Sequence, residues 1–277
     1  MQVAFQGTEG AYSEEVLLKA FPEAHPIGFP TFHQVFQAVA RGEVERGVVP
    51  VENTTAGSIN QTYDLLLEYD LHVVGELILR VRHCLLAPPG TKLEAVRRVK
   101  SHPQALAQCD GFLARYHLEA IPVYDTGGAA QELALHPEPD LAAIASRRAA
   151  ERWGLEVLAE SIEDSPYNFT RFFVLAQEDL PRNGENYKTS VVFATRHRPG
   201  DLYRVLQPFA EAQVNLSKLE SRPRRDRPFS YVFYLDFEGH PEDPGPAQAL
   251  LGLLRQASFV KILGSYPASH DWLTELG

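Results

Sequence analysis

Polar side chains and glycines gather at five points where an apolar, strand-like run passes into a helix-like segment. In open sheets of parallel strands, ligands bind at this edge, beside the carboxyl ends of the strands. The N-termini of the following helices offer free N–H groups and a positive dipole, which suit carboxylates. One such cluster alone is more often a helix cap, but five on one edge predict a site for a small anion. The clusters are residues 7–13, 52–55, 101–104, 125–128 and Ser146.

The sharpest local pattern is Asn168-Phe169-Thr170-Arg171-Phe172. It places an amide, a hydroxyl and a guanidinium at the start of a strand, where Thr170 and Phe172 share one face and Arg171 points to the other. Because the carboxylates form no convincing pair near the clusters, any acid–base role falls to hydroxyls, amides or groups of the substrate. On pattern alone, an edge-strand threonine beside a solvated arginine is equally compatible.

Several familiar cofactor and catalytic sites are missing from the sequence. Residues 7–10 lack the third glycine of a dinucleotide fingerprint, and neither a Gly-Lys-Ser/Thr phosphate loop nor a Gly-x-Ser-x-Gly elbow occurs. The ten histidines show no metal-binding spacing, and we expect His102 to start a helix. Cys109 has no base or cation near it, so we expect an inert buried thiol. The sequence therefore predicts no metal and no organic cofactor.

The elements that carry these groups alternate between short apolar strands and helices. Thr31 and Gln34 form the pattern of a capping box, which opens one of the helices. The alternation is typical of an α/β domain with parallel strands. Strands are expected over residues 3–5, 47–51, 98–100, 120–124 and 141–145.

Two segments depart from this alternation. Residues 71–87 are too long and too continuous for one ordinary strand, and residues 171–176 form a late strand after the last helix. A strand that leaves one lobe and a strand that returns to it predict two α/β lobes joined by two crossings. We expect lobe 1 over about 1–80 and 168–178, lobe 2 over about 81–167, and a ligand cleft between them.

The pattern changes after a polar segment with proline and glycine at residues 179–186, which is typical of a linker. Strands are expected over residues 190–194, 214–221, 229–237 and 260–266, with helices over 201–212 and 247–256. The order βαββαβ is that of a ferredoxin-like domain. We therefore predict two domains, 1–178 and 188–277.

Composition excludes several classes of protein. The formal net charge is −10, which argues against nucleic acid and anionic membrane as partners, since both are usually met by a basic face. No segment has the length and apolarity of a membrane span, and the N-terminal residues lack the pattern of a signal peptide. The two cysteines, Cys84 and Cys109, form no disulfide scaffold or cysteine zinc site. We expect a cytoplasmic protein.

Taken together, five motifs resemble the prephenate dehydratase family with a C-terminal ACT regulatory domain. The resemblance covers essentially the whole chain. The ACT motif Gly-Ala-Leu-Val is here Gly200-Asp201-Leu202-Tyr203, which departs from the family at two positions. The matching motifs are Gly7-Thr8-Glu9-Gly10-Ala11-Tyr12-Ser13, Pro50-Val51-Glu52-Asn53-Thr54, Ser101-His102-Pro103-Gln104, Thr170-Arg171-Phe172 and Glu220-Ser221-Arg222-Pro223.

The resemblance implies a two-lobed catalytic domain like a periplasmic binding protein, and an enzyme that converts prephenate to phenylpyruvate. It assigns catalysis to Thr170, Asn53, Ser101 and Gln108. Ser101 and Gln108 are seven residues apart, so both face one cleft if Ser101 begins the helix. Arg171 either pairs with a substrate carboxylate or, if it faces away, anchors the lobe. The remaining substrate contacts are assigned to Gly10, Ala11, Tyr12, Thr54, Thr126, Asn168 and Phe172.

For the C-terminal domain, the resemblance implies L-phenylalanine as an inhibitory effector and self-association into a dimer or tetramer. The expected effector contacts are Gly200, Leu202, Asn215, Leu216, Glu220 and Ser221. The domain could instead be only a platform for dimerisation.

Two other functions stay open from the sequence. Arogenate dehydratase differs only in an amine for a ketone on the substrate. A non-catalytic sensor of small anions can share the two-lobed fold.

Overall fold

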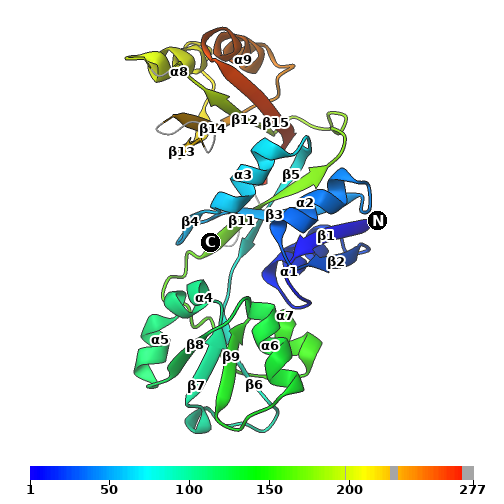
Figure 1. Cartoon of the computed structure of the whole chain (residues 1–277), viewed down its shortest axis with the longest axis vertical. Helices are drawn as coiled ribbons and strands as arrows, with labels where there is room; N and C mark the ends of the chain where they lie inside the picture. The colour runs from blue at the N-terminus through cyan, green and yellow to red at the C-terminus, as the bar shows by residue number, and fades with distance from the viewer. Residues whose placement is uncertain (197, 225–229, 270–277) are drawn as a thin grey trace. The chain divides into compact units, whose positions relative to one another are not determined.

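The computed structural model describes residues 1–196, 198–224 and 230–269 (Figure 1). The chain divides into two compact units. The first consists of Met1–Tyr63 and Leu77–Phe173, and the second of Asp64–Glu76 and Val174–Ser269. The expected domains, 1–178 and 188–277, stay a prediction. The second unit takes in a short segment that comes far earlier in the chain.

The first sheet has the strand order β2-β1-β3-β11-β5, and β4 pairs with β3. Strand β1 runs parallel to β2 and β3, as the strand–helix alternation predicts. Thr31 caps α2 through the expected capping box with Gln34. The strands are β1 (Gln2–Gln6), β2 (His25–Phe29), β3 (Arg46–Asn53), β4 (Gly57–Ser58), β5 (His72–Arg80) and β11 (Phe169–Ala176); the helices are α1 (Tyr12–Ala20), α2 (Phe32–Ala40) and α3 (Asn60–Glu68).

The second sheet has the order β10-β6-β9-β7-β8. Strands β8 and β9 run parallel to β7, while β6 is antiparallel to β9 and β10. Every residue of β9 is buried, because helices cover both faces of the sheet. The strands are β6 (Cys84–Ala87), β7 (Arg98–Ser101), β8 (Glu119–Pro122), β9 (Leu141–Ala145) and β10 (Glu156–Glu160); the helices are α4 (Pro103–Gln108), α5 (Asp110–Arg115), α6 (Thr126–Leu135) and α7 (Arg147–Trp153), with a 3-10 turn η1 (Leu93–Ala95).

The apolar stretch 71–87 contains two strands that belong to different sheets. Strand β5 ends at Arg80 in the first sheet, and β6 begins at Cys84 in the second. The chain returns through β11 to the first sheet. The two crossings meet where the Val81 amide donates to the Asn168 carbonyl oxygen at 2.7 Å. The predicted pair of α/β lobes with two crossings is therefore confirmed.

The second unit carries an antiparallel sheet of order β13-β14-β12-β15. This is the order of a ferredoxin-like βαββαβ fold, as predicted. One face of the sheet packs on both helices around Phe193, Phe209 and Phe237. The predicted strand start at Phe229 lies outside the described residues. The elements are β12 (Tyr187–Ala194), α8 (Asp201–Glu211), β13 (Leu216–Pro223), β14 (Tyr231–Glu238), α9 (Pro244–Gln256) and β15 (Phe259–Pro267).

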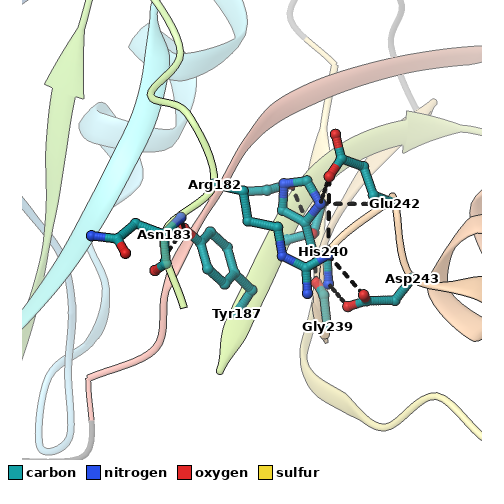
Figure 2. Close-up of polar contacts among 9 residues, drawn as sticks. Arg182, Asn183, Tyr187, Gly239, His240, Glu242 and Asp243 are labelled. Carbon is teal, nitrogen blue, oxygen red and sulfur yellow. Dashed lines mark hydrogen bonds and ion pairs between the residues drawn. The ribbon is translucent and has the colours of Figure 1, made fainter. Parts of the chain in front are cut away.

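The polar segment before β12 is held by the loop between β14 and α9 (Figure 2). Arg182 forms an ion pair with Asp243 at 2.8 Å, and its guanidinium lies over the ring of Tyr187. The Tyr187 ring meets His240 edge to face. The segment predicted as a linker therefore belongs to the second unit and is held by contacts within it.

Within the second unit, residues 64–76 are held by long basic side chains of the antiparallel sheet. Lys188 pairs with the fully buried carboxylate of Glu76 at 2.8 Å, and Arg222 pairs with Asp64 at 2.9 Å. Lys261 Nζ donates to the Leu66 carbonyl oxygen at 3.0 Å, near the C-terminus of α3. A cation there complements the negative end of the helix dipole.

Candidate active site

A cavity of about 350 Å³ lies between the two lobes of the first unit. It brings together ends of strands, N-termini of helices and one of the crossings. Among the described residues that line it, none is lysine or arginine, and the lone carboxylate is that of Asp125. The polar lining relevant to chemistry is Tyr12, Asn53, Gln61, His83, His102, Gln104, Gln108, Asp125, Thr126 and Thr170, with Phe32, Tyr124 and Phe172 as aromatic walls.

Thr170 lies on β11 with its hydroxyl toward the side chain of Asn53 at the end of β3. The Asn53 amide nitrogen donates to Thr170 Oγ1 at 3.0 Å, to Asn168 Oδ1 at 2.8 Å and to the Phe169 carbonyl oxygen at 3.1 Å. Since Thr170 Oγ1 accepts this hydrogen bond, the hydroxyl keeps its own hydrogen for another acceptor. Thr170 lines the cavity, so that acceptor can be a bound molecule.

The oxygen of the Asn53 side chain is held as firmly as its nitrogen. Asn53 Oδ1 accepts from the Thr55 amide at 3.0 Å and from the Thr55 hydroxyl at 2.7 Å. Gln108 Nε2 approaches from the second lobe and donates to Thr55 Oγ1 at 2.6 Å. Gln108 Oε1 accepts from Asn168 Nδ2 at 3.1 Å. The network therefore fixes both ends of the Asn53 amide.

His83 and Tyr12 complete this network at the first crossing. His83 Nε2 lies 2.8 Å from Gln108 Oε1, and His83 Nδ1 lies 2.8 Å from the Tyr12 hydroxyl. With the Gln108 amide in this orientation, Oε1 accepts from His83 Nε2, which places the ring hydrogen on Nε2. Burial lowers the pKa of His83 and raises that of Tyr12 well above its usual value. Both side chains are therefore neutral near pH 7.

The cavity meets the N-termini of α1 and α6, where Tyr12 and Thr126 stand at the first helical position. Asp125 caps α6 by accepting from the Gly128 amide, whereas no side chain caps α1. Free N–H groups and the positive end of a helix dipole favour a carboxylate. The arrangement can therefore hold an anion without a lysine or arginine.

Not all of the residues predicted for the site lie in the cavity. The structure places there Thr170, Asn53, Gln108, Ala11, Tyr12, Thr126 and Phe172. Asn168 stands behind it, bonded to Asn53 and Gln108.

The expectation that Ser101 begins a helix and faces the cleft is wrong. Ser101 is fully buried at the end of β7, and its hydroxyl donates to the Ile144 carbonyl oxygen at 2.6 Å. Helix α4 begins after His102, whose Nδ1 accepts from the Gln104 amide, so Ser101 does not begin the helix. The role of His102 as a helix start is as predicted, while Ser101 joins β7 to β9.

Gly10 and Thr54 also support the cavity rather than line it. Gly10 has a φ of +91°, and a Cβ there would come within 2.9 Å of Ala149, so it allows α7 to pack closely. The Thr54 hydroxyl accepts from the Phe169 amide at 2.9 Å and donates to the Tyr167 carbonyl oxygen at 2.5 Å. This joins the loop after β3 to the second crossing.

Arg171 points to the face of β11 opposite Thr170. Its guanidinium lies 4.8 Å from the ring centroid of Phe173 and 4.0 Å from Glu52. Of the two roles considered for Arg171, this placement favours the anchor within the lobe. The contact with a substrate carboxylate would need a different side-chain direction.

Sequence reasoning missed His83, which is central to the network. His83 lies in the apolar stretch 71–87, where a single histidine is only a break in the apolar pattern. The available signal was the run Arg80-Val81-Arg82-His83, because polar residues in a crossing between lobes border the cleft.

The described residues hold no cluster of three or more histidine, cysteine, aspartate or glutamate side chains that could bind a metal. Cys84 and Cys109 are buried, and burial raises the pKa of both thiols. Across the described ranges, no helix is long and apolar enough to cross a membrane.

Comparison with known proteins points to one family. The family model described as prephenate dehydratase matches residues 3–180. The chain is 46% identical to arogenate dehydratase/prephenate dehydratase 2, chloroplastic, of Arabidopsis thaliana, over 99% of this chain and 74% of that protein.

Two solved structures share the fold over nearly the whole chain. A prephenate dehydratase from Arthrobacter aurescens in complex with L-Phe has a TM-score of 0.89 and 32% identity, over 97% of this chain and 90% of that one. A structure described as a novel type of quorum-quenching acylase has a TM-score of 0.90 and 38% identity, over 98% and 99% of the two chains.

Proposed function

Because the chain belongs to the prephenate dehydratase family, we propose that it converts prephenate to phenylpyruvate, carbon dioxide and water. The enzyme is a carbon–oxygen lyase. The prephenate dianion takes up one proton: the ring hydroxyl leaves as water, and the ring carboxylate leaves as carbon dioxide. The electron pair of the broken carbon–carbon bond enters the ring and makes it aromatic. No redox partner is required.

The protein must therefore orient a dianion and assist the departure of a hydroxyl group. One observation carries the proposal: the Thr170 hydroxyl lines the cavity while its oxygen accepts from Asn53 at 3.0 Å. This bond directs the Thr170 hydrogen toward the leaving hydroxyl of the substrate. An ordinary threonine hydroxyl is too weak an acid to lose its proton outright. Thr170 donates a hydrogen bond that strengthens as negative charge develops on the leaving oxygen.

The carboxylates of the substrate are held by the first turn of α1, which no side chain caps, and by neutral donors. The absence of lysine and arginine from the described lining suits this reaction, because a strong ion pair with the ring carboxylate would oppose its loss as neutral carbon dioxide. Phe172 and Phe32 supply apolar walls for the ring.

Arogenate is the second candidate substrate, and Asp125 is the observation that favours it. Arogenate carries an ammonium group where prephenate has a ketone, and the Asp125 carboxylate lines the cavity. The relative from Arabidopsis thaliana bears both activities in its name. Measuring kcat/KM for both substrates decides the preference, and Asp125→Asn, which keeps a helix cap, lowers the value for arogenate more than for prephenate.

The name of the acylase neighbour suggests hydrolysis of an amide, but the chemistry of the cavity favours the dehydratase. Acyl transfer by a threonine needs a base that removes its proton. The neighbour of Thr170 Oγ1 is the amide nitrogen of Asn53, which donates and cannot take up a proton.

Phenylalanine is the effector, and it inhibits the enzyme through an ACT domain formed by β12 to β15. The Arthrobacter aurescens neighbour was determined with L-Phe. Gly200 and Leu202 stand at the start of α8, and Asn215, Leu216, Glu220 and Ser221 lie at or on the edge strand β13. Asp201, one of the departures from the family motif, pairs with Arg204 at 2.6 Å. A second copy of the chain completes the effector site at this edge.

The test is turnover of prephenate by the purified chain, followed by the absorbance of phenylpyruvate, with and without phenylalanine. Turnover without added metal or cofactor, and inhibition by phenylalanine, support the proposal. A chain that binds prephenate without turnover is a sensor instead. A cytoplasmic location stays a prediction, since the Arabidopsis thaliana relative is chloroplastic.

A further inference from the structure

We propose that His83 is a positioning residue, whose neutral ring, with its hydrogen on Nε2, sets which end of the Gln108 amide faces Asn53 and Thr55. The inference rests on the proposed function, because it assigns His83 a part in aligning Thr170. His83 itself does not supply a proton to the substrate, since both of its ring nitrogens are engaged by the protein.

The ring of His83 has little freedom to turn. It is 2% exposed, and its two nitrogens each lie 2.8 Å from a partner, Gln108 Oε1 on one side and the Tyr12 hydroxyl on the other. The backbone amide of His83 donates to Glu163 Oε2 at 2.9 Å, and the Tyr12 ring packs edge to face against the imidazole. A ring fixed in this way presents one hydrogen in one direction.

The Gln108 amide has two orientations of similar shape, which exchange its oxygen and nitrogen. In the observed orientation, Oε1 receives His83 Nε2–H and Asn168 Nδ2, while Nε2 donates to Thr55 Oγ1 and lies 3.4 Å from Asn53 Oδ1. In the exchanged orientation, the Gln108 nitrogen would face the donors of His83 and Asn168. The Gln108 oxygen would face the oxygens of Thr55 and Asn53. Each mismatch costs a buried hydrogen bond.

The surroundings of Nδ1 are compatible with a ring hydrogen on Nε2. The Tyr12 hydroxyl donates to the Arg82 carbonyl oxygen at 3.0 Å and lies 2.8 Å from His83 Nδ1. When Nδ1 carries no hydrogen, these two acceptors share the hydroxyl hydrogen, and the ring hydrogen on Nε2 serves Gln108.

The hydrogen bonds form one continuous path from Tyr12 through His83, Gln108 and Thr55 to Asn53. The path joins α1, the first crossing, α4 and the loop after β3, and it ends on the amide that bonds Thr170. In enzymes generally, a misplacement of a catalytic group by about 1 Å can lower the rate by about 100-fold. His83 therefore acts on the reaction without touching the substrate's reacting atoms.

The experiment uses the full chain with His83→Phe, which keeps a ring but removes both hydrogen bonds, and His83→Gln, which keeps a donor near the position of Nε2. The expected result is a fall in kcat of about 10- to 100-fold for His83→Phe with a change in KM below about threefold. His83→Gln recovers most of the loss. The exposed His25 on β2 gives the matched control: His25→Phe leaves kcat unchanged.

A double-mutant cycle separates positioning from general support of the fold. On a Gln108→Ala background, His83→Phe has no further effect on kcat if it acts through Gln108. Equal effects on both backgrounds, or a His83→Phe variant that keeps more than half of kcat, overturn the proposal.

A nitrogen NMR measurement on the wild-type chain near pH 7.5 reports the tautomer independently of turnover. The expected signature is a hydrogen on His83 Nε2, and a hydrogen on Nδ1 refutes the inference. Failure of the wild-type chain to turn over prephenate would instead refute the proposed function, whatever the tautomer.

Discussion

Replacing Asn53 by aspartate tests the direction of the hydrogen bond that prepares Thr170. The substitution keeps the shape of the side chain but turns the donor at 3.0 Å from Thr170 Oγ1 into an acceptor. The Thr170 hydroxyl then donates to the new carboxylate instead of to the substrate. In the wild-type chain, the Asn53 amide nitrogen donates to Asn168 Oδ1 and to the Phe169 carbonyl oxygen. In the variant, the carboxylate faces these two oxygens without a hydrogen to donate.

The size of the effect follows from the bond that must be broken at each turnover. A hydrogen bond to a charged acceptor is worth about 1.5–3 kcal/mol, which corresponds to about 10- to 100-fold in kcat. KM rises as well, because a carboxylate in the lining repels a dianionic substrate. The fall in kcat reports the lost alignment of Thr170, whereas the rise in KM reports repulsion of the dianionic substrate.

The assay is the initial rate of phenylpyruvate formation at saturating prephenate, on protein shown to be folded by near-ultraviolet circular dichroism. A folding check is needed because a buried carboxylate among acceptors destabilises the native state. Asn186→Asp, at an exposed position, controls for the added charge. A folded Asn53→Asp enzyme with kcat within threefold of wild type would refute this reasoning about Thr170.

Three further predictions test other parts of the account. Ser101→Ala keeps kcat within about threefold but lowers the free energy of unfolding by about 1–2 kcal/mol, measured by urea unfolding, because a buried hydrogen bond is lost. Arg222→Met weakens inhibition by phenylalanine without a matching fall in uninhibited kcat, since Arg222 links β13 to Asp64 on α3, the helix whose first turn carries the cavity residue Gln61. Burial lowers the pKa of His83, so its contribution to stability is present above about pH 6.5 and is lost as pH falls through the folded pKa; the pH dependence of unfolding should flatten in His83→Gln.

The fold was predictable from the sequence because its signals are local and repeated. Alternating apolar runs and helices predict the two α/β lobes, and the length of residues 71–87 predicts a crossing between sheets. The order βαββαβ follows from short strands of regular spacing. The association of residues 64–76 with the second unit was not predictable, because it depends on single long side chains such as Lys188 and Lys261.

The site residues were predictable only where the motif residue lies on the face of its strand or helix that borders the cavity. Thr170 and Asn53 reach the cavity because they end or begin strands at the lobe boundary. Ser101 does not, since the residue that caps α4 is His102 and the Ser101 hydroxyl turns toward Ile144. His83 has a role that only tertiary contacts reveal, because its two partners are 25 and 71 residues away in the chain.

The central claim is that the Thr170 hydroxyl assists departure of the substrate's hydroxyl group, and Thr170→Val tests it most directly. Valine keeps the shape of the side chain and removes the hydrogen-bond donor. The measurement is kcat for prephenate, together with the dissociation constant of prephenate for the variant, determined by calorimetry. We predict a fall in kcat of about 100-fold or more with a dissociation constant within about threefold of the wild-type KM. A folded Thr170→Val enzyme that retains near-normal kcat would contradict the account.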